Sequence, residues 1–230
     1  MGTVQKGLIA AGLLAWVGVA HAGRPLVTED AGVLGRGECE IETFLARERA
    51  SEEPTVRGWS AQIGCGIGLS TQLALNATGS EADDERVRRF ALTGKTSLRE
   101  LTDEQAGVAI AYFFGAEKLP AASYKYETTS LTAVATLPVD KWLFHANLGW
   151  ARSQSAGSDS TIWAVAAERT EVGPVDLAVE SFGDDHSAAW IQVAARWAIV
   201  PERFFLDASY GVQASGARPT LLTIGAKFAF

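Results

Sequence analysis

The chain is poor in several features that nucleic-acid-binding, helical membrane and multidomain proteins use. Its 230 residues include only two cysteines, seven prolines and three histidines, and the formal net charge is −7. An acidic chain without a block of basic residues is not expected to bind nucleic acid. Beyond residue 22, no apolar run approaches the ~20 residues of a transmembrane helix. No low-complexity tract or linker is evident, so we expect one domain.

The first residues predict export. Residues 1–22 place Lys6 before an apolar run and end on Ala20-His21-Ala22, a small-x-small cleavage pattern. This arrangement is typical of a secretory signal peptide, and the run is too short to span a bilayer as a helix. We expect cleavage after Ala22, a periplasmic or luminal segment at 23–36, and a barrel domain at 37–230.

Polar and apolar residues alternate with period two along almost all of the remaining chain, whereas helical periodicity is rare. Each alternating segment has about the 9–11 residues that a tilted strand needs to cross a bilayer, or slightly more. The stretch SLRELTDEQA at 97–106 is long for a turn, and we expect a short helical turn there. The pattern predicts twelve strands, near residues 37–48, 56–67, 70–79, 86–97, 105–115, 124–137, 141–153, 160–171, 174–182, 187–199, 203–214 and 219–230.

The two faces of these strands favour a membrane barrel over a soluble sandwich. Short connections alternate with longer polar ones, as periplasmic turns and outer loops do in antiparallel outer-membrane barrels. One face carries aromatic residues near strand ends, typical of the two interfaces of a bilayer. The predicted interface aromatics are Trp59, Trp142, Trp150, Trp163, Trp197 and Phe228. We therefore expect an all-β transmembrane barrel in the lipid of the outer membrane of a Gram-negative bacterium.

The opposite face carries charges that a sandwich core would bury at several kcal/mol each, but that a polar or salt-bridged lumen accommodates. Acids and bases are mixed on this face, so they can pair across the lumen and partly close it. The predicted lumen-lining residues are Glu40, Glu42, Gln62, Arg89, Lys95, His145, Asn147, Glu168, Asp176, Glu180, Gln192, Arg196, Asp207 and Lys227.

The chain ends on Phe230, on the predicted lipid-facing stripe of the last strand. Such an end resembles the C-terminal signature that the barrel-assembly machinery reads in Gram-negative outer-membrane proteins. Cys39 and Cys65 are equidistant from a first loop centred near Glu52, so they should face each other across a hairpin. Export permits a disulfide between them; the alternative is two thiols near the rim without a special role.

Evidence for catalysis is scarce. A hydrolase needs a nucleophile, a base within hydrogen-bond reach and an orienting group. His145 shares a strand face with Asn147 but has no serine at a neighbouring same-face position, and Ser187 should point away from His186. No cluster has recognisable metal-ligand spacing. We expect no enzyme, metal or cofactor, and interpret His145 as a luminal histidine hydrogen-bonded to Asn or Glu.

Several short motifs resemble one family. The stretches RPLVTEDAG (24–32), GECEIE (37–42), FHANLGW (144–150) and LLTIGAKFAF (221–230) are similar to a large family of outer-membrane proteins named for transport in the meta-pathway of phenol degradation. The resemblance implies an outer-membrane barrel and uptake of small hydrophobic or aromatic compounds. It supplies no catalytic residue.

We therefore expect a passive channel or transporter for small solutes. Two alternatives remain open: a structural or adhesive barrel with a filled lumen, and a lipid-modifying enzyme of the outer membrane.

Overall fold

The computed structural model describes residues 24–51, 53–83 and 85–230, and the predicted signal peptide lies outside them. Within these ranges, no helix is long and apolar enough to span a membrane. The described residues form twelve strands: β1 (Cys39–Arg49), β2 (Val56–Gly68), β3 (Thr71–Ala82), β4 (Glu85–Arg99), β5 (Gly107–Lys118), β6 (Lys125–Val139), β7 (Trp142–Ser153), β8 (Ser158–Val172), β9 (Val175–Asp184), β10 (Trp190–Val200), β11 (Phe204–Gln213) and β12 (Thr220–Ala229).

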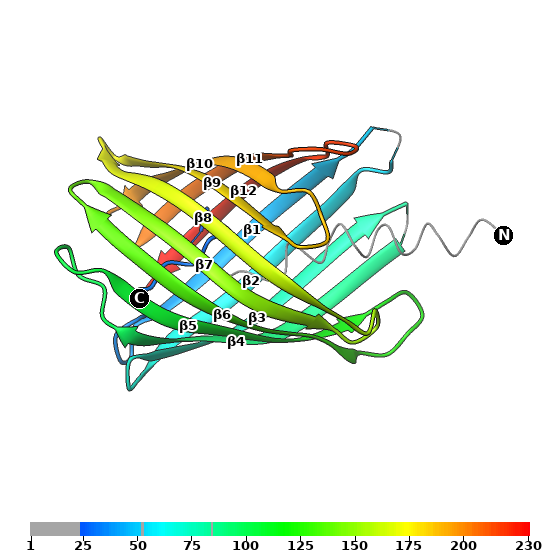
Figure 1. The fold of residues 1–230 in the computed structure, drawn as a ribbon, viewed down its shortest axis with the longest axis horizontal. Helices are drawn as coiled ribbons and strands as arrows, with labels where there is room; N and C mark the ends of the chain where they lie inside the picture. The colour runs from blue at the N-terminus through cyan, green and yellow to red at the C-terminus, as the bar shows by residue number, and fades with distance from the viewer. Residues whose placement is uncertain (1–23, 52, 84) are drawn as a thin grey trace.

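The strands close into one antiparallel barrel (Figure 1). Each strand pairs with its neighbour in the chain, and β12 pairs with β1 to complete the ring. At the end of this seam, Cys39 and Phe230 exchange two backbone hydrogen bonds of 2.8 Å. Closure removes the free sheet edges, so the backbone groups of every strand have partners on both sides. The predicted fold is confirmed.

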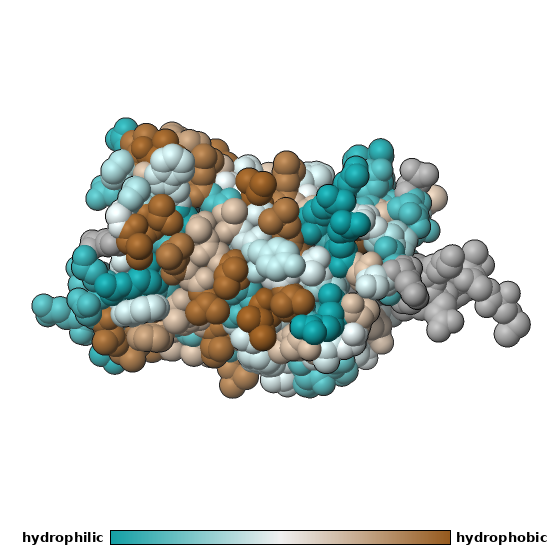
Figure 2. Space-filling model, turned by 90° about the horizontal axis from the view of Figure 1, so that it is seen from above, coloured by the Kyte–Doolittle hydropathy of each residue, from teal (hydrophilic) through white to brown (hydrophobic). Residues whose placement is uncertain are grey.

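Alternate residues of each strand face opposite sides of the barrel wall. In β10, Ile191 and Val193 are exposed on the outside, whereas the intervening Gln192 is buried inside. In β11, Leu206 and Tyr210 are exposed, and Asp207 between them is buried. Figure 2 shows hydrophobic residues over much of the outer wall and hydrophilic residues gathered mainly towards its two ends. This distribution is what an apolar exterior and a polar interior require.

The connections differ at the two ends of the barrel. At the end that holds the C-terminus, most turns are short, and residues such as Leu69, Asp140 and Gly173 adopt the positive φ that tight turns need;. The connection at 97–106 is not a helical turn, contrary to the prediction. Strand β4 continues to Arg99 by pairing with β5, and Thr102 and Gln105 then exchange two backbone hydrogen bonds of 3.2 Å.

The aromatic residues of the outer wall fall near both ends of the barrel. Trp142, Trp197, Phe228 and Phe230 are exposed near the short turns. The rings of Phe228 and Phe230 stack with their centroids 5.7 Å apart. Near the longer loops, Trp59 and Trp150 are exposed on the same outer wall, and Trp163 is half-buried.

Cys39 and Cys65 are opposite each other in the register of β1 and β2 and form a disulfide. The bond joins the first two strands at the short-turn end of the barrel, where the chain enters β1.

Candidate functional site: a segment inside the lumen

Residues 24–36, which precede the first strand, lie inside the barrel. They follow the inner wall as an arc and contact all twelve strands, in an order that runs from the β11–β12 side through β10, β9 and β7 towards β2. We call residues 24–36 the luminal segment. The contacts on successive strands are Glu42, Gly66, Gln72, Lys95, Ala109, Thr136, Asn147, Ala166, Glu180, Gln192, Asp207 and Thr223.

Arg24 anchors the beginning of the luminal segment. Its Nε donates a hydrogen bond of 3.0 Å to Asp207, and its Nη2 donates one of 3.1 Å to the hydroxyl of Thr223. The guanidinium also lies 4.2 Å from the ring centroid of Phe44, an arrangement that favours a cation–π contact. Gly225 makes room for this group, because a Cβ there would lie 2.5 Å from Nε of Arg24.

The next residues are held by a carboxylate of β9. Glu180 accepts hydrogen bonds from the backbone amides of Val27 and Thr28, at 2.9 and 2.8 Å, and from the hydroxyl of Thr28 at 2.7 Å. Gln192 donates a further hydrogen bond of 2.6 Å to the same carboxylate. Burying a carboxylate is costly unless its oxygens are hydrogen-bonded, and here donors from both the segment and the wall satisfy them.

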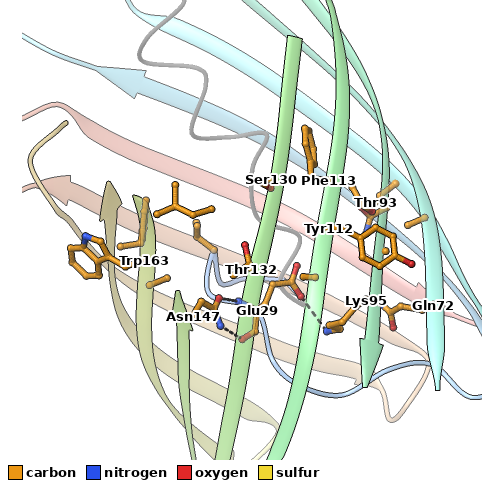
Figure 3. A pocket seen from close by; sticks show the side chains of 18 residues that line it. Glu29, Gln72, Thr93, Lys95, Tyr112, Phe113, Ser130, Thr132, Asn147 and Trp163 are labelled. Carbon is orange, nitrogen blue, oxygen red and sulfur yellow. Dashed lines mark hydrogen bonds and ion pairs between the residues drawn. The ribbon is translucent and has the colours of Figure 1, made fainter. Parts of the chain in front are cut away.

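Glu29 is the centre of the luminal segment (Figure 3). Its backbone amide donates to Oδ1 of Asn147 at 2.6 Å, and its carbonyl accepts from Nδ2 of Asn147 at 2.9 Å. Nζ of Lys95, on β4, lies 3.1 Å from the Glu29 carboxylate and 2.8 Å from the carbonyl of Asp30. Asn147 and Lys95 therefore hold this residue from two separate parts of the wall, on β7 and β4, with β5 and β6 between them.

The end of the segment returns to the wall near the short turns. The Ala31 amide donates to Oγ1 of Thr136 at 2.9 Å, and the Leu34 amide donates to Gln72 at 2.9 Å. Arg36 then forms a parallel β-bridge with Gly66. Apolar contacts accompany these bonds, because Ala31 packs with Ala109 and Val134.

All fourteen predicted lumen residues occupy inward-facing strand positions, but they do not form one cluster. They divide into separate contacts along the lumen. Near the short turns, Lys227 pairs with Glu40, and Arg196 pairs with Glu168 at 2.8 Å. Near the long loops, Arg89 pairs with Glu117. Five of the predicted residues bind the luminal segment directly: Lys95, Asn147, Glu180, Gln192 and Asp207. Gln62 instead lines a small cavity beside the segment. Asp176 is half-buried and lies opposite Arg196 in the sheet register.

A cavity of about 60 Å³ lies beside the luminal segment, enough for a few water molecules. Charged and polar groups meet aromatic ones around it. Glu29 of the segment and Lys95 of β4 border it, and the inward-facing Phe113 of β5 supplies an aromatic ring (Figure 3). The lumen is thus narrow here and combines an ion pair with aromatic surface.

Around His145, a hydroxyl, an imidazole and a carboxylate follow one another as they do in a catalytic triad. Oγ1 of Thr136 is 3.0 Å from Nδ1 of His145, and Nε2 of His145 is 3.6 Å from the Glu168 carboxylate. However, Thr136 is only 1% exposed, and its hydroxyl already accepts the Ala31 amide. A nucleophile needs access to its substrate, and Thr136 lies beneath the luminal segment. This geometry favours a structural role for His145.

Sequence reasoning missed several residues of this site, including Arg24, Glu29, Thr136 and Glu117. A signal for Thr136 was present, because Thr136 and His145 are equidistant from the turn at 140–141, as the two cysteines are from their loop. Glu117 follows from the alternation of β5. Arg24 and Glu29 precede the strands, so no periodicity could assign them partners.

Among the solved structures that this chain resembles, three illustrate the similarity. The COG4313 outer membrane channel from Pseudomonas putida F1 matches with a TM-score of 0.65 and 11% identity, over 87% of this chain and 98% of that one. A KdgM porin in complex with disordered oligogalacturonate matches with a TM-score of 0.62 and 9% identity, over 83% and 99%. Outer membrane phospholipase A from Escherichia coli matches with a TM-score of 0.53 and 7% identity, over 90% and 94%.

At these identities the neighbours establish the fold alone. No curated protein sequence matches the chain. The resemblance to the phenol-degradation family is not among these findings and stays a prediction. A family model described as "Uncharacterised conserved protein UCP029691" matches residues 10–230, so the chain belongs to that family.

Proposed function

We propose that this protein is an outer-membrane channel for small solutes in which the luminal segment forms the constriction. The observation that carries this proposal is the arc of residues 24–36, which contacts all twelve strands, mostly through side chains of the inner wall. A barrel with a purely structural role needs only a filled core. Here the contacts are largely ionic or polar, and they border a cavity between Glu29, Lys95 and Phe113.

The membrane location is supported by the outer wall and by the neighbours. Leucine, isoleucine, valine and aromatic side chains are exposed around the barrel, which water would disfavour but hydrocarbon would not;. Proteins of the same fold include an outer membrane channel and a porin.

We further propose solutes that carry an aromatic or other apolar part. Phe113 offers ring surface to such a group, while Lys95 and Glu29 offer charge to a polar substituent. Binding at a constriction must be weak enough for the solute to leave again.

The first experiment is single-channel conductance of the refolded protein beginning at residue 23, compared with a version beginning at residue 37. We expect small discrete steps for the first protein and larger steps for the second, because the second lacks the luminal segment. Heat-modifiable gel mobility must show that both are folded. Liposome swelling with benzoate and with a sugar of similar size then tests solute preference.

Other results would favour other functions. Two folded proteins without conductance would contradict the channel and favour a structural barrel. Hydrolysis of phospholipid that disappears in His145→Ala would favour a lipid-modifying enzyme.

A further inference from the structure

At the outward strand positions next to the long loops of β1 to β5, bases outnumber acids, although Glu53, Asp83 and Glu85 lie in or beside those loops. The outward charged residues there comprise six bases and a single acid, although the chain as a whole is acidic. We call the six bases the arginine patch. Its members are Arg47 and Arg49 on β1, Arg57 on β2, Arg86 and Arg88 on β4, and Lys118 on β5; the acid is Glu81 on β3.

The register places these groups side by side. Arg47 is directly opposite Arg57, and Arg88 is directly opposite Lys118. Like charges that face each other across antiparallel strands are destabilising without a counter-ion. Glu81 pairs with Arg86 at 3.0 Å. Within the part of the chain that the structure describes, Arg47, Arg49, Arg57 and Arg88 form no ion pair.

A groove of about 370 Å³ lies within the patch. Arg57, Arg86 and Arg88 border it together with one acid, Glu81, and Leu45 and Trp59 supply apolar surface. Trp59 lies across β3, since a Cβ on Gly79 would be 2.4 Å from its indole nitrogen.

A second, apolar groove of about 610 Å³ continues from the first along the same strands, away from the loops. Small residues form its floor: Ala61 follows Trp59 on the outward face of β2, and Ala77 precedes Gly79 on β3. Phe90 and Phe114 are among its lining residues. A charged groove next to the loops and an apolar groove further from them thus occupy successive outward positions of the same strands.

We propose that these two grooves bind a phosphorylated glycolipid of the lipid A type, with its phosphates on the arginine patch and an acyl chain in the apolar groove. Arginine binds phosphate through paired charge-assisted hydrogen bonds, and a lipid supplies the counter-charge that the patch lacks. The other half of the barrel offers no equivalent: near its loops, the outward Arg152 is already paired with Asp159 at 3.0 Å. This inference rests on the proposed outer-membrane location.

The test is a titration of the full-length mature protein in detergent micelles with diphosphoryl lipid A, with the same lipid lacking both phosphates, and with inorganic phosphate. The test variant is Arg47→Gln/Arg57→Gln/Arg88→Gln. Its matched control is Arg99→Gln/Arg203→Gln/Arg218→Gln, which removes the same charge from exposed positions outside the patch. The substituted side chains are all exposed, and heat-modifiable mobility verifies that each barrel is folded.

We expect the wild type and the control to bind diphosphoryl lipid A alike and the test variant to bind at least about tenfold more weakly, because charge-assisted hydrogen bonds to phosphate are lost. A second variant with lysine at the three positions should keep part of the affinity, since charge remains but the paired geometry does not.

Three results would overturn the proposal: equal binding by the test variant, equal binding of the lipid without phosphates, or complete displacement by millimolar inorganic phosphate. The last would indicate a site for a free anion. Conductance of the test variant is measured in parallel. If the test variant loses lipid binding but keeps its conductance, the lipid site is independent of the channel. If the wild type binds the lipid but shows no conductance, the channel proposal is contradicted and the lipid-binding proposal is not.

Discussion

The ammonium of Lys95 on β4 lies 3.1 Å from the carboxylate of Glu29, which precedes the first strand. Both side chains are more than nine-tenths buried, and the pair joins the luminal segment to the barrel wall. Removing one partner of a buried ion pair leaves an uncompensated charge, at a cost of about 3–5 kcal/mol. The segment is therefore held in place by interactions that single substitutions can test.

Lys95→Ala should release the middle of the luminal segment. We expect a lower urea midpoint of unfolding and larger single-channel steps. Without Lys95, the buried Glu29 carboxylate has lost its counter-charge and is more stable when it moves into water. The matched control is Arg152→Ala, whose exposed pair with Asp159 should contribute only about 0–1 kcal/mol. Unchanged conductance in Lys95→Ala would show that the segment does not form the constriction.

Arg196→Glu should shift ion selectivity towards cations. Arg196 lies on the inner wall and pairs with Glu168 at 2.8 Å. The substitution therefore replaces a positively charged luminal side chain with a third acidic side chain near Glu168 and Asp176. The reversal potential in a salt gradient measures the change. Arg169→Glu is the control, because Arg169 faces outward on β8 and should leave selectivity unaltered.

Loss of the Cys39–Cys65 disulfide should lower stability without removing the fold. The bond joins residues 26 apart in sequence, and closing a loop of that size stabilises a protein by about 3.5 kcal/mol in the chain-entropy model. Cys39→Ser/Cys65→Ser should therefore unfold at lower urea than the wild type. A reducing agent should lower the midpoint of the wild type to that of the variant and leave the variant unchanged.

Deletion of Phe230 should reduce assembly in the outer membrane. The residue supplies both backbone hydrogen bonds to Cys39 at the seam, and its exposed ring stacks on Phe228. We expect less heat-modifiable barrel in outer-membrane fractions. Phe230→Tyr keeps the backbone bonds and the ring, so it should assemble as the wild type does; equal assembly of the deletion would argue against an assembly signal.

Local pattern was enough to predict the barrel wall. Period-two alternation located all twelve strands to within a few residues, because a strand with one apolar and one polar side must alternate. The equal spacing of Cys39 and Cys65 from the first loop predicted their register, since a hairpin pairs residues that are equidistant from its turn. The same argument predicted that the charged positions face inward.

Only the tertiary structure decided what fills the lumen. The sequence shows that residues 24–36 carry two arginines and two acids, but a segment without periodic structure can lie in any direction relative to the strands. Its partners are far away in the chain: Lys95 is 66 residues from Glu29, and Asp207 is 183 residues from Arg24. Such contacts depend on closure of the ring, which brings β4, β7, β9 and β11 around one interior and lets a short segment bind them all.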